Sequence, residues 1–267
     1  MILLLETVLF FVMRQSYFKP QASSPHARVS LFRKYKILKP AKTETKPVPR
    51  YRIIQKFIFE GVNALSGWEE KVFKGKTLYE VVKESDASFL RAVSSASASG
   101  LYARVNIAPS PDLYLSWGWR ARSFPKRGNP DKLADKSQDD FAARIYVVFP
   151  GSNFFNSNVI EYIWDENIVE KTVSSSPFSQ RIKLFVIRSG KNKTNAGEWQ
   201  EEERNIYEDY KSLYGKPPDR SIGAIAIMSD SDNTKTTSEA DFRDVTFKIK
   251  EAANAETQAN GKAGEGK

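Results

Sequence analysis

The strongest constraint on the fold of this 267-residue chain is residues 139–149, where two aspartates lead into side chains that alternate in character. Every second residue from Phe141 to Phe149 is apolar, whereas the positions between them include Arg144 and Tyr146. A period of two is typical of a β-strand with one face in a hydrophobic core. We expect Arg144 to have an acidic partner, because a guanidinium is rarely buried unpaired.

Short segments of this kind recur along the chain and are separated by residues typical of turns. They lie at residues 53–60, 71–73, 77–83, 88–95, 101–107, 113–122, 159–164, 181–188, 221–229 and 240–250. Many short strands with almost no helix predict an all-β fold, an antiparallel β-sandwich or barrel.

One helix is predicted at residues 201–214. Three glutamates stand at its start, where the helix dipole favours negative charge. Ile206, Tyr210 and Leu213 then form an apolar stripe. Gly215 follows as a residue that ends helices. We expect this helix to pack on an edge or open end of the sandwich.

The net charge of +9 is concentrated in residues 14–52, which hold eleven Lys or Arg residues and one acidic residue, Glu44. Residues 53–267 hold 30 basic and 30 acidic residues and are therefore neutral. A nucleic-acid-binding domain is expected to carry its own basic face, so nucleic acid is not an expected partner. The proline-containing basic segment is predicted to be a linker, either a soluble tether or a peripheral contact with an anionic surface.

The predicted layout is an apolar segment at 1–13, the basic linker at 14–52, a β-sandwich domain at 53–250 and a disordered tail at 251–267. As a helix, residues 2–13 of the apolar segment would rise about 18 Å, which is too short to cross a membrane. Its length suits the hydrophobic region of an export signal, but the positive charge follows it instead of preceding it. A misassigned start codon is the alternative interpretation.

Composition excludes several kinds of chemistry. The chain has no cysteine, and its single histidine, His26, lies outside the predicted domain. Disulfides and thiolate metal sites are therefore excluded, and a catalytic Ser-His-Asp triad is not expected in the domain. Any catalysis would depend on carboxylate, Tyr, Lys or Arg side chains. We expect no cofactor, and a non-catalytic role is favoured over an enzyme.

The alternating segment at 113–122 has one apolar face that carries Trp117 and Trp119. Sugars stack on such rings, so two tryptophans could form a platform if this face were open. The leucines beside them favour a position in the core instead. The opposite face then carries Tyr114 and Arg120 on either side of two small residues, which predicts a trough.

Glu161 is the expected partner of Arg144, because it interrupts an otherwise apolar strand. Two interpretations stay open. In the first, the two form a buried ion pair that fixes strand register, and changing them together to Met and Leu should recover most of the stability that Arg144→Ala removes. In the second, they belong to a polar floor that binds sugar hydroxyls or a carboxylate. The candidate ligand-binding set is Tyr114, Arg120, Asp140, Arg144, Tyr146 and Glu161.

Two acidic patterns carry weaker hypotheses. Asp139 and Asp140 would point to opposite faces of a strand, so a carboxylate pair for glycoside cleavage would need Asp140 together with Glu161. The segment Asp230-Ser231-Asp232-Asn233 is rich in the oxygen ligands that Ca²⁺ prefers. Asx turns explain the same composition, and a metal at Asp230 and Asp232 stays an open question.

Several segments together resemble the bacterial family described as domain of unknown function 3047. They are residues 99–102, 115–119, 139–149, 162–164, 203–210 and 226–234, within roughly 55–250. Members of that family look exported, so the resemblance implies the periplasm or cell envelope. The strand pattern is also similar to galactose-binding-like jelly-roll carbohydrate-binding modules, which implies an antiparallel jelly-roll-like β-sandwich.

These resemblances favour an exported or envelope-associated, non-catalytic glycan-binding module with an envelope polysaccharide as its partner. The alternatives are a glycan-active enzyme and a structural or interaction protein of the envelope. The ligand and the oligomeric state stay open.

Overall fold

The computed structural model describes residues 49–252, apart from residues 86, 130, 153–155 and 191–197. The apolar segment at 1–13, nearly all of the basic linker and most of the C-terminal tail lie outside the described residues. The described residues belong to one compact unit. Among them, no helix is both long and apolar enough to span a membrane.

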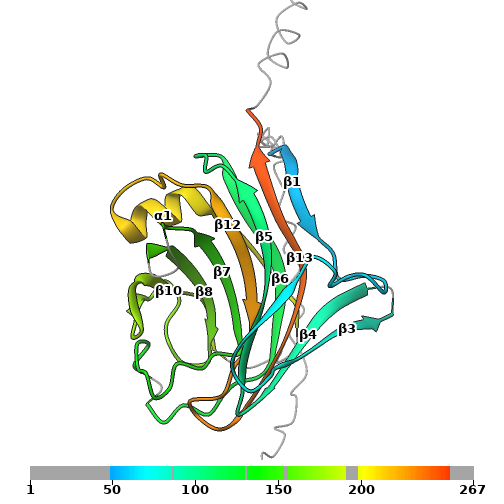
Figure 1. Cartoon of the computed structure of the whole chain (residues 1–267), viewed down its shortest axis with the longest axis vertical. Coiled ribbons are helices and arrows are strands. Elements are labelled where there is room, and N and C mark those ends of the chain that lie inside the picture. The colour runs from blue at the N-terminus through cyan, green and yellow to red at the C-terminus, as the bar shows by residue number, and fades with distance from the viewer. Residues whose placement is uncertain (1–48, 86, 130, 153–155, 191–197, 253–267) are drawn as a thin grey trace, which may run out of the picture. The chain divides into compact units, whose positions relative to one another are not determined.

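The described chain forms two β-sheets and one helix (Figure 1). The elements are β1 (Tyr51–Phe57), β2 (Glu69–Lys74), β3 (Leu78–Glu84), β4 (Ala87–Ser95), β5 (Ala98–Ile107), β6 (Leu113–Ser123), β7 (Ala143–Phe149), β8 (Asn158–Asp165), β9 (Val173–Ser176), β10 (Ser179–Ser189), β11 (Gln200–Asn205), α1 (Ile206–Tyr214), β12 (Ile222–Met228) and β13 (Thr237–Lys250).

The six-stranded sheet has the order β11-β6-β13-β4-β3, with β1 also paired to β13. The seven-stranded sheet has the order β2-β5-β12-β7-β8-β10-β9. The predicted all-β, jelly-roll-like sandwich is therefore confirmed. One pair, β8 with β10, runs parallel, which departs from a purely antiparallel sandwich.

The core lies between the two sheets and is built from alternate residues of the strands. In β6 the inward residues include Trp117 and Trp119, which are 1% and 0% exposed, and their ring centroids lie 5.3 Å apart. Ile145 and Val147 of β7 are fully buried in the same cluster. The core interpretation of the two tryptophans is thus confirmed, and a sugar platform on this face is wrong because no part of the rings is accessible.

The predicted helix at 201–214 is correct in its end but not in its start. Residues 200–205 form β11, an edge strand antiparallel to β6, and the helix begins at Ile206. Asn205 caps it, because its side chain accepts a hydrogen bond from the Glu208 N–H at 3.0 Å. Gly215 ends it with φ of 72°, a left-handed conformation that favours glycine.

Helix α1 is held against both sheets. The buried Tyr210 ring lies 4.6 Å from Phe149 of β7. The Tyr162 hydroxyl of β8 donates to Asp209 at 2.7 Å, and Arg204 of β11 donates to the same carboxylate at 2.9 Å. The helix is therefore fixed to a strand of each sheet by buried contacts, in agreement with the predicted packing on an edge or end of the sandwich.

Candidate functional site

The six predicted site residues lie in separate places. Tyr114 and Arg120 belong to β6 of the six-stranded sheet, whereas Arg144, Tyr146 and Glu161 belong to β7 and β8 of the seven-stranded sheet. Asp140 lies in the loop that precedes β7. The fold therefore brings Arg144, Tyr146 and Glu161 together, but does not join Tyr114 and Arg120 to them, because the two groups stand on different sheets.

The trough predicted beside Arg120 is filled by side chains. Arg120 donates to the buried Asp241 at 2.6 Å. Arg243 and Glu201 form an ion pair over Gly118, and a Cβ atom at that glycine would lie 2.8 Å from both side chains. Small residues are needed here because other side chains occupy the space above them, so the trough offers no room for a ligand.

Arg144 is the centre of a buried cluster on the outer face of the seven-stranded sheet, the face turned away from the other sheet. Its guanidinium donates two hydrogen bonds to Asp230, at 2.9 and 2.6 Å, and one to Glu161 at 2.8 Å. It also donates to the Tyr146 hydroxyl at 3.2 Å and lies over the Phe141 ring at 4.5 Å. Arg144 and Glu161 are each 2% exposed. The predicted Arg144–Glu161 ion pair is confirmed.

Asp230 was not predicted as a partner of Arg144, although it takes the bidentate contact. It immediately follows Ser229, next to a strand whose Met228 is in register with Arg144. That register depends on strand pairing, which the sequence does not state. The loop is tied further to the cluster because the Asp230 carboxylate accepts from the Phe141 N–H at 3.1 Å.

The cluster holds more acidic groups than its one guanidinium can neutralise. Asp139, Glu161 and Asp230 all lie within 4 Å of Arg144. Burial is the largest influence on the pKa of all three carboxyls. It raises each pKa, whereas Arg144 lowers it. The pKa of Glu161 rises to about 7. Up to a pH of about 7, the pKa of Glu161 lets the folded chain keep a proton that the unfolded chain would release.

This shift predicts a pH dependence of stability. The folded chain holds the Glu161 proton to higher pH than the unfolded chain does. The stability that this raised pKa contributes is therefore complete below the ordinary pKa of 4.5, and it is lost as the pH rises through about 7. The free energy of unfolding should fall across this window. Glu161→Gln, which cannot ionise, should reduce the fall by on the order of 1–3 kcal/mol. Urea unfolding at several pH values checks this, and identical profiles would contradict it.

Asp140 has a different role from the Arg144 cluster. Its carboxylate accepts from the backbone N–H groups of Asn233 and Thr234 at 3.2 and 2.6 Å, so it shapes the loop after β12. Asp140 is fully buried and Glu161 nearly so, and each takes its hydrogen bonds from the protein. Neither carboxylate is presented to a glycosidic bond in this arrangement, which gives no support to catalysis by the pair.

The oxygen-rich loop brings the carboxylates of Asp140, Asp230 and Asp232 within 4.8 Å of one another. The oxygens of Asp140 and Asp230 already accept protein hydrogen bonds. The Lys74 ammonium lies 3.4 Å from the Asp232 carboxylate and supplies positive charge to the group. Protein donors thus account for these carboxylates without a metal ion, in line with the turn interpretation.

The outer side of β12, beside the Arg144 cluster, carries partly accessible side chains. Strand register places Tyr102, Ala226 and Tyr146 in one row across β5, β12 and β7. Ala224 and Ala226 are partly accessible although β12 has two strands of the sheet on one side and four on the other. Since strands lie about 4.8 Å apart, the two tyrosines stand about 10 Å apart across a floor of alanine. We call these four residues the β12 face.

One wall of the β12 face is fixed by polar contacts. The Tyr102 hydroxyl donates to Glu69 on the neighbouring strand β2, and Arg104 donates to the same carboxylate at 3.1 Å. The Arg104 and Glu69 side chains are 74% and 56% exposed. The other wall, Tyr146, is held by Arg144. The face therefore combines two oriented phenol rings with accessible charged and hydrogen-bonding groups.

The family model described as "Protein of unknown function (DUF3047)" matches residues 66–246, and the chain belongs to this family. No curated protein sequence is significantly similar to the chain.

Among solved structures, a family 11 carbohydrate-binding module of the cellulase Lic26A-Cel5E from Clostridium thermocellum is similar, with 10% identity and a TM-score of 0.39 over 78% of this chain and 99% of that one. The cellulose induced protein Cip1 has 7% identity and a TM-score of 0.40 over 72% and 96% of the two chains. The mannan-recognising module TmCBM27 has 8% identity and a TM-score of 0.35 over 75% and 98%.

Proposed function

We propose that this domain is a non-catalytic glycan-binding module and that the β12 face is its binding surface. The observation that carries the proposal is the partly accessible alanine floor in the interior of a seven-stranded sheet, between two tyrosines. A sheet interior is normally covered when its side chains are large and apolar. Here the side chains are small and partly accessible, and a tyrosine stands on the strand at either side of them.

The chemistry of this surface matches a sugar better than an apolar or a strongly charged ligand. Phenol rings present apolar faces to the C–H groups of a pyranose ring and hydroxyls to its polar edge. Glu69 and Arg104 add an acceptor and donors at one side of the floor, which supports recognition of hydroxyl groups. Their charges offset each other, so a neutral glycan is favoured over an anionic one.

The buried cluster has a supporting role in this proposal. Arg144 and Glu161, predicted as ligand-binding residues, would act by holding Tyr146 and the loop at 139–141 in place. The location proposed with this function is the periplasm or cell envelope, where an envelope polysaccharide would be the partner. The length of the apolar run at residues 2–13, which suits the hydrophobic region of an export signal, supports this location.

Affinity gel electrophoresis of the whole chain tests the binding proposal. Soluble mixed-linked β-glucan, mannan and a bacterial capsular polysaccharide serve as probes. We expect at least one to retard the chain. Tyr102→Ala should lower the affinity obtained from that retardation about 10- to 30-fold, because it removes an aromatic side chain that contacts the sugar. Ala226→Trp should abolish it by filling the floor.

Tyr207→Ala is the matched control, since Tyr207 is a half-exposed tyrosine on α1, away from the β12 face. It should leave retardation unchanged. Unchanged binding in Tyr102→Ala and Ala226→Trp, or an equal loss in Tyr207→Ala, would contradict the assignment of this face. Retardation by none of the probes would count against glycan binding itself.

A further inference from the structure

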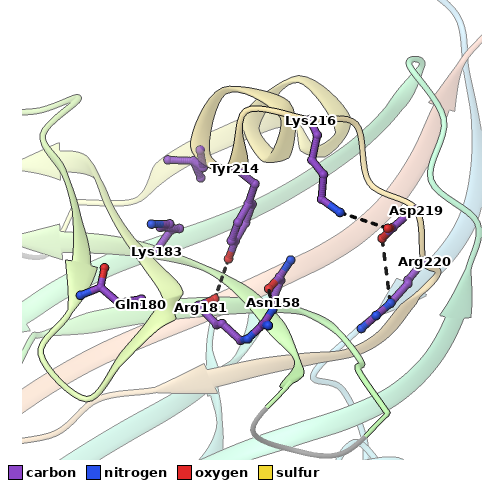
Figure 2. A pocket seen from close by; sticks show the side chains of 9 residues that line it. Asn158, Gln180, Arg181, Lys183, Tyr214, Lys216, Asp219 and Arg220 are labelled. Atoms are coloured by element: carbon purple, nitrogen blue, oxygen red, sulfur yellow. Dashed lines mark hydrogen bonds and ion pairs between the residues drawn. The ribbon is translucent and has the colours of Figure 1, made fainter.

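A pocket of about 350 Å³ lies where the end of α1 meets the first residues of β8 and β10 (Figure 2). It is separate from the β12 face, because Lys183 of this pocket is in register with the core residue Ile160 and so lies on the inner side of β10. Its size falls in the range of small-molecule sites and suits a group as large as one sugar residue.

The pocket has a fixed frame. The Tyr214 hydroxyl accepts from the Val159 N–H at 3.0 Å and lies 2.7 Å from the carbonyl oxygen of Arg181. These contacts tie the last turn of α1 to β8 and β10. Arg181 also donates to the Asn158 side chain at 3.1 Å (Figure 2). The walls therefore come from three elements whose relative positions are set by hydrogen bonds.

The lining is strongly positive, although residues 53–267 as a whole carry no net charge. Arg181, Lys183, Lys216 and Arg220 contribute four positive charges, and Asp219 contributes the one carboxylate. Lys216 and Arg220 share that carboxylate, at 3.1 and 4.0 Å. Two of the four cations thus have no counter-charge from the lining itself.

Lys183 is the most informative of these cations because it is half-buried. Its ammonium bonds to the neutral Ser175 hydroxyl at 2.8 Å and lies 5.8 Å from the centre of the Tyr214 ring. By contrast, the buried and half-buried arginines elsewhere in the described chain pair with carboxylates; they are Arg91, Arg120, Arg122, Arg127, Arg144, Arg188, Arg204 and Arg243.

A helix C-terminus attracts cations, and this effect accounts for Lys216, which follows the end of α1. It does not account for Arg181 and Lys183, which come from β10 and face the pocket from the opposite side (Figure 2). A bound oxyanion would give these two cations the counter-charge that the described lining does not supply. The guanidinium of Arg181 suits a carboxylate or phosphate, since its donors match two oxygens at once.

We propose that this pocket binds a sugar residue that carries an anionic group, either a carboxylate or a phosphate. The cations hold the anionic group. The side-chain amides of Asn158 and Gln180 can bond to hydroxyls, and the Tyr214 ring offers an apolar wall. The proposal stands on this pocket alone and does not depend on the function of the β12 face.

Isothermal titration calorimetry of the whole chain tests this proposal with four probes: glucuronate, glucose 6-phosphate, glucose and inorganic phosphate. We expect one or both anionic sugars to bind, and glucose to bind at least about tenfold more weakly. Arg181→Gln and Lys183→Gln should each weaken the anionic sugar about tenfold or more, because each removes a charged donor. Added salt should weaken the binding as well.

Lys211→Gln is the control, because Lys211 lies on the same helix, outside the pocket lining. The basic residues 14–52 are present in every variant and contribute equally. Three results would overturn the proposal: no binding of either anionic sugar at about 10 mM, inorganic phosphate binding as tightly as glucose 6-phosphate, or equal affinities in Arg181→Gln and Lys211→Gln. Tyr102→Ala should leave this binding intact, so failure here is distinguishable from failure at the β12 face.

Discussion

Arg144→Ala is expected to lower the free energy of unfolding by about 3–5 kcal/mol, because it leaves buried carboxylates without their shared cation. Asp230 would lose two hydrogen bonds and Glu161 one. Both acidic side chains are at most 2% exposed, so water could not replace the lost donors. Urea unfolding followed by tryptophan fluorescence measures the change. A loss below about 1 kcal/mol would contradict a structural role for the guanidinium.

The way in which stability can be restored is also expected to differ from the prediction made from sequence. Arg144→Met together with Glu161→Leu should recover only part of the loss, because Asp230 would stay buried without a cation. Adding Asp230→Asn removes that charge and keeps an acceptor for the Phe141 N–H. The triple variant should therefore be more stable than the double variant. Equal stabilities would show that Asp230 does not depend on Arg144.

Asp241→Ala is expected to have a comparable effect on the opposite sheet, about 3–5 kcal/mol. The Asp241 carboxylate is fully buried and lies 2.9, 2.6 and 2.5 Å from donors of Arg91, Arg120 and Arg122. Its removal leaves three guanidinium groups close together. Glu84→Ala is a matched control, because Glu84 contacts the same three arginines from the surface.

The Glu84 side chain is 47% exposed, so we expect its removal to cost about 1 kcal/mol or less. Urea unfolding of both variants gives the comparison. Asp241→Ala is therefore expected to be clearly less stable than Glu84→Ala. If the two variants lose the same stability, burial does not determine the strength of this network.

The sequence predicted most strands because alternation reports directly on burial. It predicted which face of β6 and β7 lies in the core, and it predicted an acidic partner for Arg144. It could not predict which strands share a sheet, since that depends on pairing between distant segments. For this reason Arg120 and Arg144 were placed in one candidate site, although β6 and β7 belong to different sheets.

The start of α1 shows a second limit of prediction from the sequence. Three consecutive glutamates before an apolar stripe suit the first turn of a helix, and they suit an edge strand equally well. Tertiary contacts decide between the two: the Glu202 carboxylate accepts hydrogen bonds from Trp119 and Arg188, which requires an extended backbone beside β6. The end of the helix was predictable because Gly215 acts locally.

The β12 face was missed, although its signal is present in the sequence. Ala224 and Ala226 alternate with Ile225 and Ile227, a pattern of small outward and large inward residues. Small outward residues indicate a binding surface only when the side chains beside them are known. Tyr102 and Tyr146 lie 124 and 80 positions before Ala226, so the sequence does not show that they are its neighbours. Their row across the sheet follows from strand register, which the structure supplies.

The most direct measurement of the central claim is a titration of the ¹⁵N-labelled chain followed by NMR. The probes are oligosaccharides prepared from the polysaccharide that retards the chain in affinity electrophoresis. The account predicts that the amide resonances of Tyr102, Ala226 and Tyr146 shift together, with one affinity, while those of Tyr114 and Trp117 on the other sheet stay in place. Shifts confined to the six-stranded sheet, or to the pocket beside α1, would contradict glycan binding at the β12 face.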